Sequence, residues 1–87
     1  AYLSKRASVK EGTVIMHHAL INANSVIGKN CIVNSKALIE HDCIVENHCH
    51  ISTAAVLNGG SFIREGTFFG SNALSKEGIE INGFIKA

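Results

Sequence analysis

The chain has 87 residues, of which 46% are hydrophobic, and its formal net charge is +1. This length suits one small domain. The sequence shows no basic stripe interleaved with aromatic residues, which argues against nucleic-acid binding, and no long uncharged apolar run suited to crossing a membrane. Residues 1–10 are rich in charge and lack the apolar region of a signal peptide, so we expect a cytoplasmic location.

A bulky apolar residue occurs at every sixth position from residue 3 to residue 69, and a small residue stands two positions before nearly all of them. This period fits neither an α-helix nor a simple strand. It is typical of hexapeptide repeats, which build a parallel β-helix. The apolar series is Leu3, Val9, Ile15, Ile21, Ile27, Val33, Ile39, Val45, Ile51, Leu57, Ile63 and Phe69.

Each hexapeptide is expected to form a short extended stretch followed by a turn. The bulky residue points inward and the residue before it points outward, because side chains alternate along a strand. The outward series from Val14 to Leu74 is apolar except at His50. An apolar outer face of this extent predicts packing against other subunits.

The turn is expected three positions after each bulky residue. Seven of the twelve residues at these positions are Gly or Asn, which tolerate left-handed backbone angles. The twelve positions are Gly12, His18, Asn24, Asn30, Lys36, Asp42, His48, Ala54, Gly60, Gly66, Asn72 and Gly78.

Three hexapeptides that close a triangle give an 18-residue coil, so the repeats over residues 3–74 predict about four coils of one all-β domain spanning 1–87. The pattern weakens after Leu74, because Ser75 takes a core position. We interpret residues 75–87 as a short C-terminal cap, with or without a short helix, or as an incomplete final coil.

The three cysteines, Cys31, Cys43 and Cys49, all fall in the small-residue series. We interpret them as small buried hydrophobic residues. Their odd number argues against a closed disulfide framework. A thiolate nucleophile is not expected at positions that the pattern buries among aliphatic side chains.

Two histidines stand out from the repeat. His50 is the one polar residue in the outward series, and His41 lies on a turn between Glu40 and Asp42. Gly59 follows His41 by one full coil and should stack directly on that turn. A base at His41, an amide donor above it and a second histidine, His50, half a coil away suit an acyl-transfer site. The alternatives are a solvated turn for His41 and a structural hydrogen bond for His50, and we interpret His17, His18 and His48 as exposed turn residues.

The sequence also resembles a known family. The segments 37–45 (ALIEHDCIV), 50–52 (HIS) and 57–60 (LNGG) are similar to those of the hexapeptide-repeat acyltransferases, and closest to the sialic-acid O-acetyltransferases and bacterial nucleotide-amino-sugar N-acetyltransferases. The resemblance implies a left-handed β-helix, a homotrimer whose active site lies between subunits, and acetyl-CoA as co-substrate. The implied acceptor is an amine or hydroxyl of a sugar or of a nucleotide-linked amino sugar.

The resemblance also implies roles for particular residues. His41 corresponds to the general base, and Asp42 to the acidic residue that raises its basicity. His50 corresponds to a histidine that contacts the acetyl-CoA thioester, and Gly59 to a glycine whose backbone N–H lies there. The full set assigned to acetyl-CoA is His50, Gly59, Gly70 and Ser71.

The expected reaction is direct attack of the acceptor on the thioester, with no acyl-enzyme and no metal. Members of this group also carry an N-terminal domain that binds the sugar nucleotide, and residues 1–87 contain no match to it, so we expect impaired activity from this chain alone. Two other interpretations stay open: a trimeric β-helix module without catalysis, and a zinc protein similar to the γ-class carbonic anhydrases.

Overall fold

The computed structural model describes all 87 residues and contains fifteen strands of two residues each, with no helix. The strands form three parallel sheets, each of five strands. Sheet A contains β1 (Tyr2–Leu3), β4 (Leu20–Ile21), β7 (Leu38–Ile39), β10 (Val56–Leu57) and β13 (Leu74–Ser75). Sheet B contains β2 (Ser8–Val9), β5 (Val26–Ile27), β8 (Ile44–Val45), β11 (Phe62–Ile63) and β14 (Glu80–Ile81). Sheet C contains β3 (Val14–Ile15), β6 (Ile32–Val33), β9 (His50–Ile51), β12 (Phe68–Phe69) and β15 (Phe84–Ile85).

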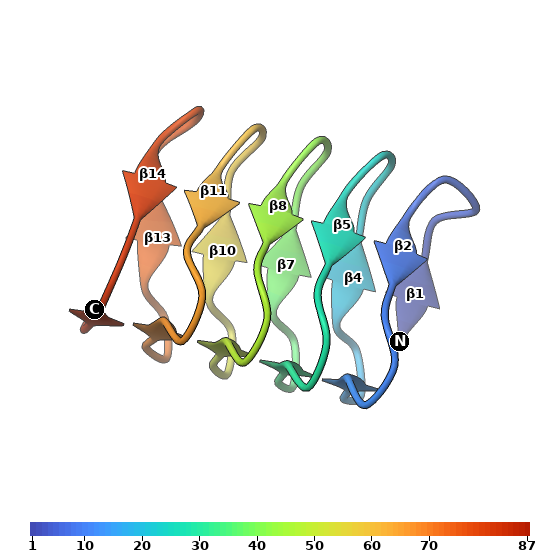
Figure 1. The fold of residues 1–87 in the computed structure, drawn as a ribbon, viewed down its shortest axis with the longest axis horizontal. Helices are drawn as coiled ribbons and strands as arrows, with labels where there is room; N and C mark the ends of the chain where they lie inside the picture. Colours follow the sequence, from blue (N-terminus) through green and yellow to red (C-terminus); the bar gives the residue numbers. More distant parts are fainter.

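The chain visits the three sheets in rotation, so each coil stacks on the one before it. Leu20 pairs with Leu38 and Ile21 with Ile39, so residues that occupy the same place in successive coils face each other. Figure 1 shows the coils side by side in sequence order, with the two termini at opposite ends of the solenoid. The left-handed parallel β-helix predicted from the repeat and the resemblance is confirmed.

Residues 75–87 continue the solenoid, so the predicted alternative of a final incomplete coil is confirmed and the structure has about five coils where about four were expected. Strands β13, β14 and β15 add a fifth strand to each sheet. The last coil is shorter than the others, since Phe68 pairs with His50 on one side and with Phe84, a closer residue in the sequence, on the other. Gly83 makes the shortened turn possible with φ of 101°. Only β15 departs from the period of six, since Ile81 of β14 still pairs with Ile63, one full coil away.

The core is one column of inward side chains along the axis of the helix. Ile21, Ile39, Leu57 and Ile63 have no exposed surface. Buried apolar area of this kind is the main source of stability in a solenoid. The predicted inward series is buried from Ile21 to Phe69, whereas Leu3 in the first coil is 46% exposed, and Val14 and Leu74 in the outward series are 50% and 68% exposed.

The small residues beside the core also make hydrogen bonds. Their hydroxyl and thiol groups donate hydrogen bonds to turn carbonyl groups of the next coil. The Oγ1 of Thr13 donates to the Gly28 carbonyl at 2.6 Å, and the Oγ of Ser25 donates to that of Glu40 at 2.6 Å. The same series leaves no buried side-chain polar atom unpaired. Ser75, which interrupted the apolar series, accepts a hydrogen bond from the Asn58 N–H at 3.0 Å.

The turns have the backbone that the sequence predicted, since all twelve predicted turn positions have positive φ. Eight of them are not glycine, and they include Lys36 (62°), Asp42 (60°) and Ala54 (59°). The left-handed region is unfavourable for residues with a Cβ, and Asn and Asp tolerate it better than Ala or Lys. Lys36 and Ala54 are therefore held there by the stacking of the coils.

The structure contains no helix with the length and apolar character needed to span a bilayer. All three cysteines are buried and unpaired by disulfides, as the small-residue series predicted. Burial raises the pKa of the Cys43 thiol. This favours the inert thiol form over the thiolate.

Candidate active site

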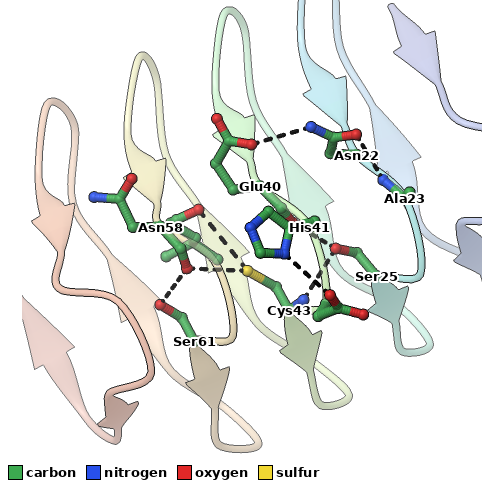
Figure 2. A network of polar contacts seen from close by, with 10 residues as sticks. Asn22, Ala23, Ser25, Glu40, His41, Cys43, Asn58 and Ser61 are labelled. Carbon is green, nitrogen blue, oxygen red and sulfur yellow. Dashed lines mark hydrogen bonds and ion pairs between the residues drawn. The ribbon is translucent and has the colours of Figure 1, made fainter.

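His41 lies at a corner of the solenoid, on the turn that joins β7 of sheet A to β8 of sheet B. Its Nδ1 lies 3.0 Å from Oδ2 of Asp42, and the two side chains are 56% and 59% exposed. Asp42 occupies the left-handed turn position, and its short side chain folds back to the preceding residue. Figure 2 shows the imidazole of His41 with one nitrogen joined to this carboxylate.

The surroundings of His41 favour its protonated form. The hydrogen bond with Asp42 raises the pKa of His41, and the charges of Asp42, Glu40 and Glu77 add to the effect. Because the carboxylate accepts a hydrogen bond only from an N–H, it places the proton of the neutral ring on Nδ1. The lone pair is therefore on Nε2, where a base needs it.

Gly59 stacks directly on His41, as predicted. A Cβ built on Gly59 would lie 2.7 Å from both Cε1 and Nε2 of His41, so any larger residue would displace the imidazole from this position. The coils are joined here by the Gly60 N–H, which donates to the His41 carbonyl at 3.0 Å. Glycine at position 59 therefore allows the imidazole to pack against the backbone of the next coil.

The backbone N–H of Gly59 has no hydrogen-bond partner within the chain, although the residue is buried. The N–H groups of His17, His41 and Thr53, at the equivalent position of other turns, also lack a partner, so Gly59 is distinguished by its contact with the imidazole. The edge of His41 that carries the Nε2 lone pair thus lies beside a free amide donor. A base next to an unpaired donor is the arrangement that proton removal and oxyanion stabilisation require.

His50 lies in the outward column of sheet C, on β9 between Ile32 and Phe68. Its ring meets Phe68 edge to face, with centroids 5.0 Å apart. Nε2 of His50 lies 3.4 Å from Nδ2 of Asn34, on the turn that follows β6. Asn34 was not predicted from the sequence, because the contact runs diagonally and does not join residues at the same place in successive coils.

Gly70 and Ser71 lie on the turn that leaves sheet C for sheet A. A Cβ on Gly70 would lie 2.6 Å from the Ile85 carbonyl, so this glycine admits the last strand of the solenoid. The exposed Oγ of Ser71 lies 2.9 Å from the buried Oγ of Ser52. Ser52 is a second residue that was not predicted, because its contact with Ser71 joins two side chains 19 residues apart and not residues at the same place in successive coils.

The predicted site residues form two groups rather than one. His41, Asp42 and Gly59 meet at the corner between sheets A and B. His50 and the turn with Gly70 and Ser71 lie on sheet C and at the corner where it meets sheet A. Sheet C is the side of the triangular coil opposite the His41 corner, and the apolar core separates the two. One chain therefore does not bring the two groups together.

The cavity on the surface of a single chain lies away from both groups of predicted site residues. A cavity of about 210 Å³ opens between sheet B and the turns that follow it, and neither His41 nor His50 lines it. Its lining residues are Lys10, Val26, Gly28, Ile44, Val45, Glu46, Asn47 and Glu65. The structure also holds no group of three or more His, Cys, Asp or Glu side chains placed to bind a metal ion.

Comparison with protein-family models and with curated proteins gave no match. Solved structures do match. The acetyltransferase domain of PglB from Neisseria gonorrhoeae, determined in complex with acetyl coenzyme A, is 32% identical, with a TM-score of 0.96 over 99% of this chain and 43% of that chain. The same domain in a second structure is 28% identical, with a TM-score of 0.79 over 98% of this chain and 45% of that chain.

A third match is the GDP-perosamine N-acetyltransferase of Caulobacter crescentus, as a variant in complex with CoA and GDP-perosamine. It is 26% identical, with a TM-score of 0.76 over 98% of this chain and 44% of that chain. This chain spans less than half the length of these three proteins. The resemblance to hexapeptide-repeat acetyltransferases of amino sugars is confirmed, and it extends over nearly the whole of this chain.

Proposed function

We propose that this chain is the β-helix of an acetyl-CoA-dependent acetyltransferase whose acceptor is an amine of a nucleotide-linked amino sugar. The observation that carries the proposal is the corner at His41: Nδ1 is held by Asp42, and the Nε2 edge packs on Gly59, whose N–H is unpaired. The similarity to two acetyltransferases, one bound to acetyl coenzyme A and one to CoA and a nucleotide sugar, supports the same class of reaction.

In the proposed reaction, the acceptor nitrogen attacks the thioester carbonyl carbon of acetyl-CoA. Nε2 of His41 removes a proton from the attacking amine as the carbon–nitrogen bond forms. The free Gly59 N–H stabilises the negative charge that develops on the carbonyl oxygen. The carbon–sulfur bond then breaks, and the proton held by His41 passes to the departing thiolate of CoA.

The acidic surroundings of His41 support an amine acceptor over a hydroxyl. Glu40, Asp42 and Glu77 all act on the charge of His41. The same carboxylates attract an amine in its protonated form, which passes one proton to solvent before its nitrogen attacks, so that His41 takes only the proton released as the carbon–nitrogen bond forms. The negative charge of these carboxylates does not attract a sugar hydroxyl, because the hydroxyl is neutral.

Assembly of at least two copies follows from the same proposal. His41 and His50 lie on opposite sides of one chain, so a site that uses both requires a corner of one copy to meet sheet C of another. The outward residues of sheet A are apolar throughout, and Tyr2 and Leu74 at its ends are 60% and 68% exposed. This surface is suited to subunit packing, and the resemblance makes a homotrimer the proposed assembly.

Replacement of His41 tests the proposal. Transfer from acetyl-CoA to amino-sugar nucleotides is measured by release of free CoA thiol, for the unchanged chain and for His41→Ala. His17→Ala is the matched control, because His17 is exposed and occupies the same position in its turn. Loss of about 10²–10⁴-fold in kcat for His41→Ala alone supports a general base. Equal rates in all three proteins exclude that role.

The competing interpretation is a trimeric β-helix module without catalysis. It predicts that none of the three proteins releases CoA and that the unchanged chain does not bind acetyl-CoA. Direct binding therefore separates a chain that is competent to bind acetyl-CoA but shows no turnover from a purely structural one.

A further inference from the structure

His50 has a partner that determines which of its two nitrogens carries the proton. Nδ2 of Asn34 lies 3.4 Å from Nε2 of His50. An amide nitrogen only donates hydrogen bonds, whereas a ring nitrogen of neutral histidine donates or accepts according to its tautomer. The tautomer of His50 therefore depends on which end of the Asn34 amide faces it.

The orientation of the Asn34 amide is fixed by the backbone. Its Oδ1 accepts a hydrogen bond from the Ser35 N–H at 2.7 Å. If the amide were turned over, its NH₂ group would face that N–H donor, and a hydrogen bond would be replaced by a repulsive contact. The oxygen therefore stays on Ser35, and the NH₂ group stays on His50.

An NH₂ group that faces Nε2 needs a lone pair there. The proton of the neutral His50 ring is consequently on Nδ1. This nitrogen makes no hydrogen bond within the chain, and the ring is held by its edge-to-face contact with Phe68 at 5.0 Å. His50 thus presents an unpaired N–H donor from the outer face of sheet C.

The two histidines are arranged in opposite ways. Asp42 accepts a hydrogen bond from His41 and leaves its Nε2 as a base, whereas Asn34 donates to His50 and leaves its Nδ1 as a donor. We propose that Asn34 is a positioning residue that holds His50 in the Nδ1–H tautomer, so that His50 donates a hydrogen bond to a carbonyl oxygen of acetyl-CoA. The donor role rests on the proposed function, while the tautomer does not.

Nitrogen-15 NMR of the histidine side chains tests the tautomer in the free chain. At a pH where the ring is neutral, correlations between ring protons and ring nitrogens distinguish a protonated from an unprotonated nitrogen. The expected result is a protonated Nδ1 and an unprotonated Nε2 for His50. The opposite assignment, or an equal mixture of both forms, overturns the proposal.

Asn34→Asp is the informative variant because it keeps the shape of the side chain and the acceptor for the Ser35 N–H. Its second oxygen accepts instead of donating, so we expect His50 to change to the Nε2–H form. Asn22→Ala is the matched control: Asn22 also begins a turn and accepts the N–H of the next residue, Ala23, at 2.8 Å, but faces Glu40 instead of a histidine. The His50 signals should change in Asn34→Asp and stay constant in Asn22→Ala. Unchanged His50 signals in Asn34→Asp contradict the proposal.

Calorimetric titration of acetyl-CoA separates the two halves of the inference. Loss of one hydrogen bond predicts that the Kd for acetyl-CoA rises about five- to tenfold in Asn34→Asp. If the unchanged chain binds acetyl-CoA and the Kd is equal in Asn34→Asp, the donor role of His50 is wrong. If the unchanged chain binds none, the proposed function fails, and the NMR result still decides the tautomer.

Discussion

Gly59→Ala gives a sharp test of the site, because it should separate activity from stability. A Cβ at this position lies 2.7 Å from Nε2 and Cε1 of His41, whereas ordinary contacts between such atoms are about 3.5–4 Å. The imidazole must therefore move by roughly 1 Å, and a misplacement of this size costs about 10²-fold in rate. The backbone N–H of residue 59 remains in place.

The stability of the same variant should change little. His41 is 56% exposed, so its ring swings into solvent at small cost, and an exposed ion pair with Asp42 is worth about 0–1 kcal/mol. Gly59 does not have a left-handed backbone, and alanine at such a position gains about 0.4–1 kcal/mol by restricting the unfolded chain. We expect the cost of displacing the His41 ring and the gain from restricting the unfolded chain to cancel nearly, so that the free energy of unfolding stays almost unchanged.

A double-mutant cycle measures the contact directly. The assay is kcat/KM for acetyl transfer together with the free energy of unfolding in urea, for the unchanged chain, Gly59→Ala, His41→Ala and the double variant. With the ring removed, Gly59→Ala should stabilise the chain by about 0.4–1 kcal/mol. Unchanged kcat/KM in Gly59→Ala, or the same stability effect with and without the His41 ring, would refute the stacking of the imidazole on Gly59.

Three further predictions follow from the site and the fold. Asp42→Asn removes the main cause of the raised pKa of His41, so the acid limb of the pH dependence of kcat/KM should move to lower pH while the maximal rate falls; an unmoved limb excludes His41 as the titrating base. Ala54→Gly relieves a left-handed alanine with φ of 59° and should stabilise the chain by about 1 kcal/mol in urea unfolding, and a destabilised variant would contradict the strain assigned to that turn. The three buried cysteines should resist a thiol reagent until the chain unfolds, and rapid modification of Cys43 in the native state would contradict its burial.

The repeat made the coil, its register and its turns predictable. One inward residue per hexapeptide sets which side chains enter the core, and the pairing of each strand with the strand one coil away follows from three sides per coil. The contact between His41 and Gly59 was predictable for the same reason, because it joins residues one coil apart on the same corner. Backbone stacking places the two residues together through the Gly60 N–H and the His41 carbonyl, while the packing of the imidazole on Gly59 also depends on the direction of the His41 side chain.

Contacts that depend on side-chain direction were not predictable. Asn34 reaches His50 diagonally, and the Oγ of Ser52 reaches Ser71 from the neighbouring turn position. Spacing also gave no hint that Gly70 is required by the Ile85 carbonyl, because the final turn departs from the period of six. The final coil was predicted only as one alternative for residues 75–87, because a hydrogen-bonded serine, Ser75, replaces an apolar core residue where that coil begins.

Calorimetric titration of acetyl-CoA into the purified chain, with chelator present, tests the proposed function most directly. Binding does not depend on the identity of the acceptor, so the result is clear even when no turnover is seen. We expect saturable binding that approaches one acetyl-CoA per subunit. Absence of binding at millimolar acetyl-CoA would contradict the proposal and leave a β-helix whose His41 corner serves no acetyl transfer.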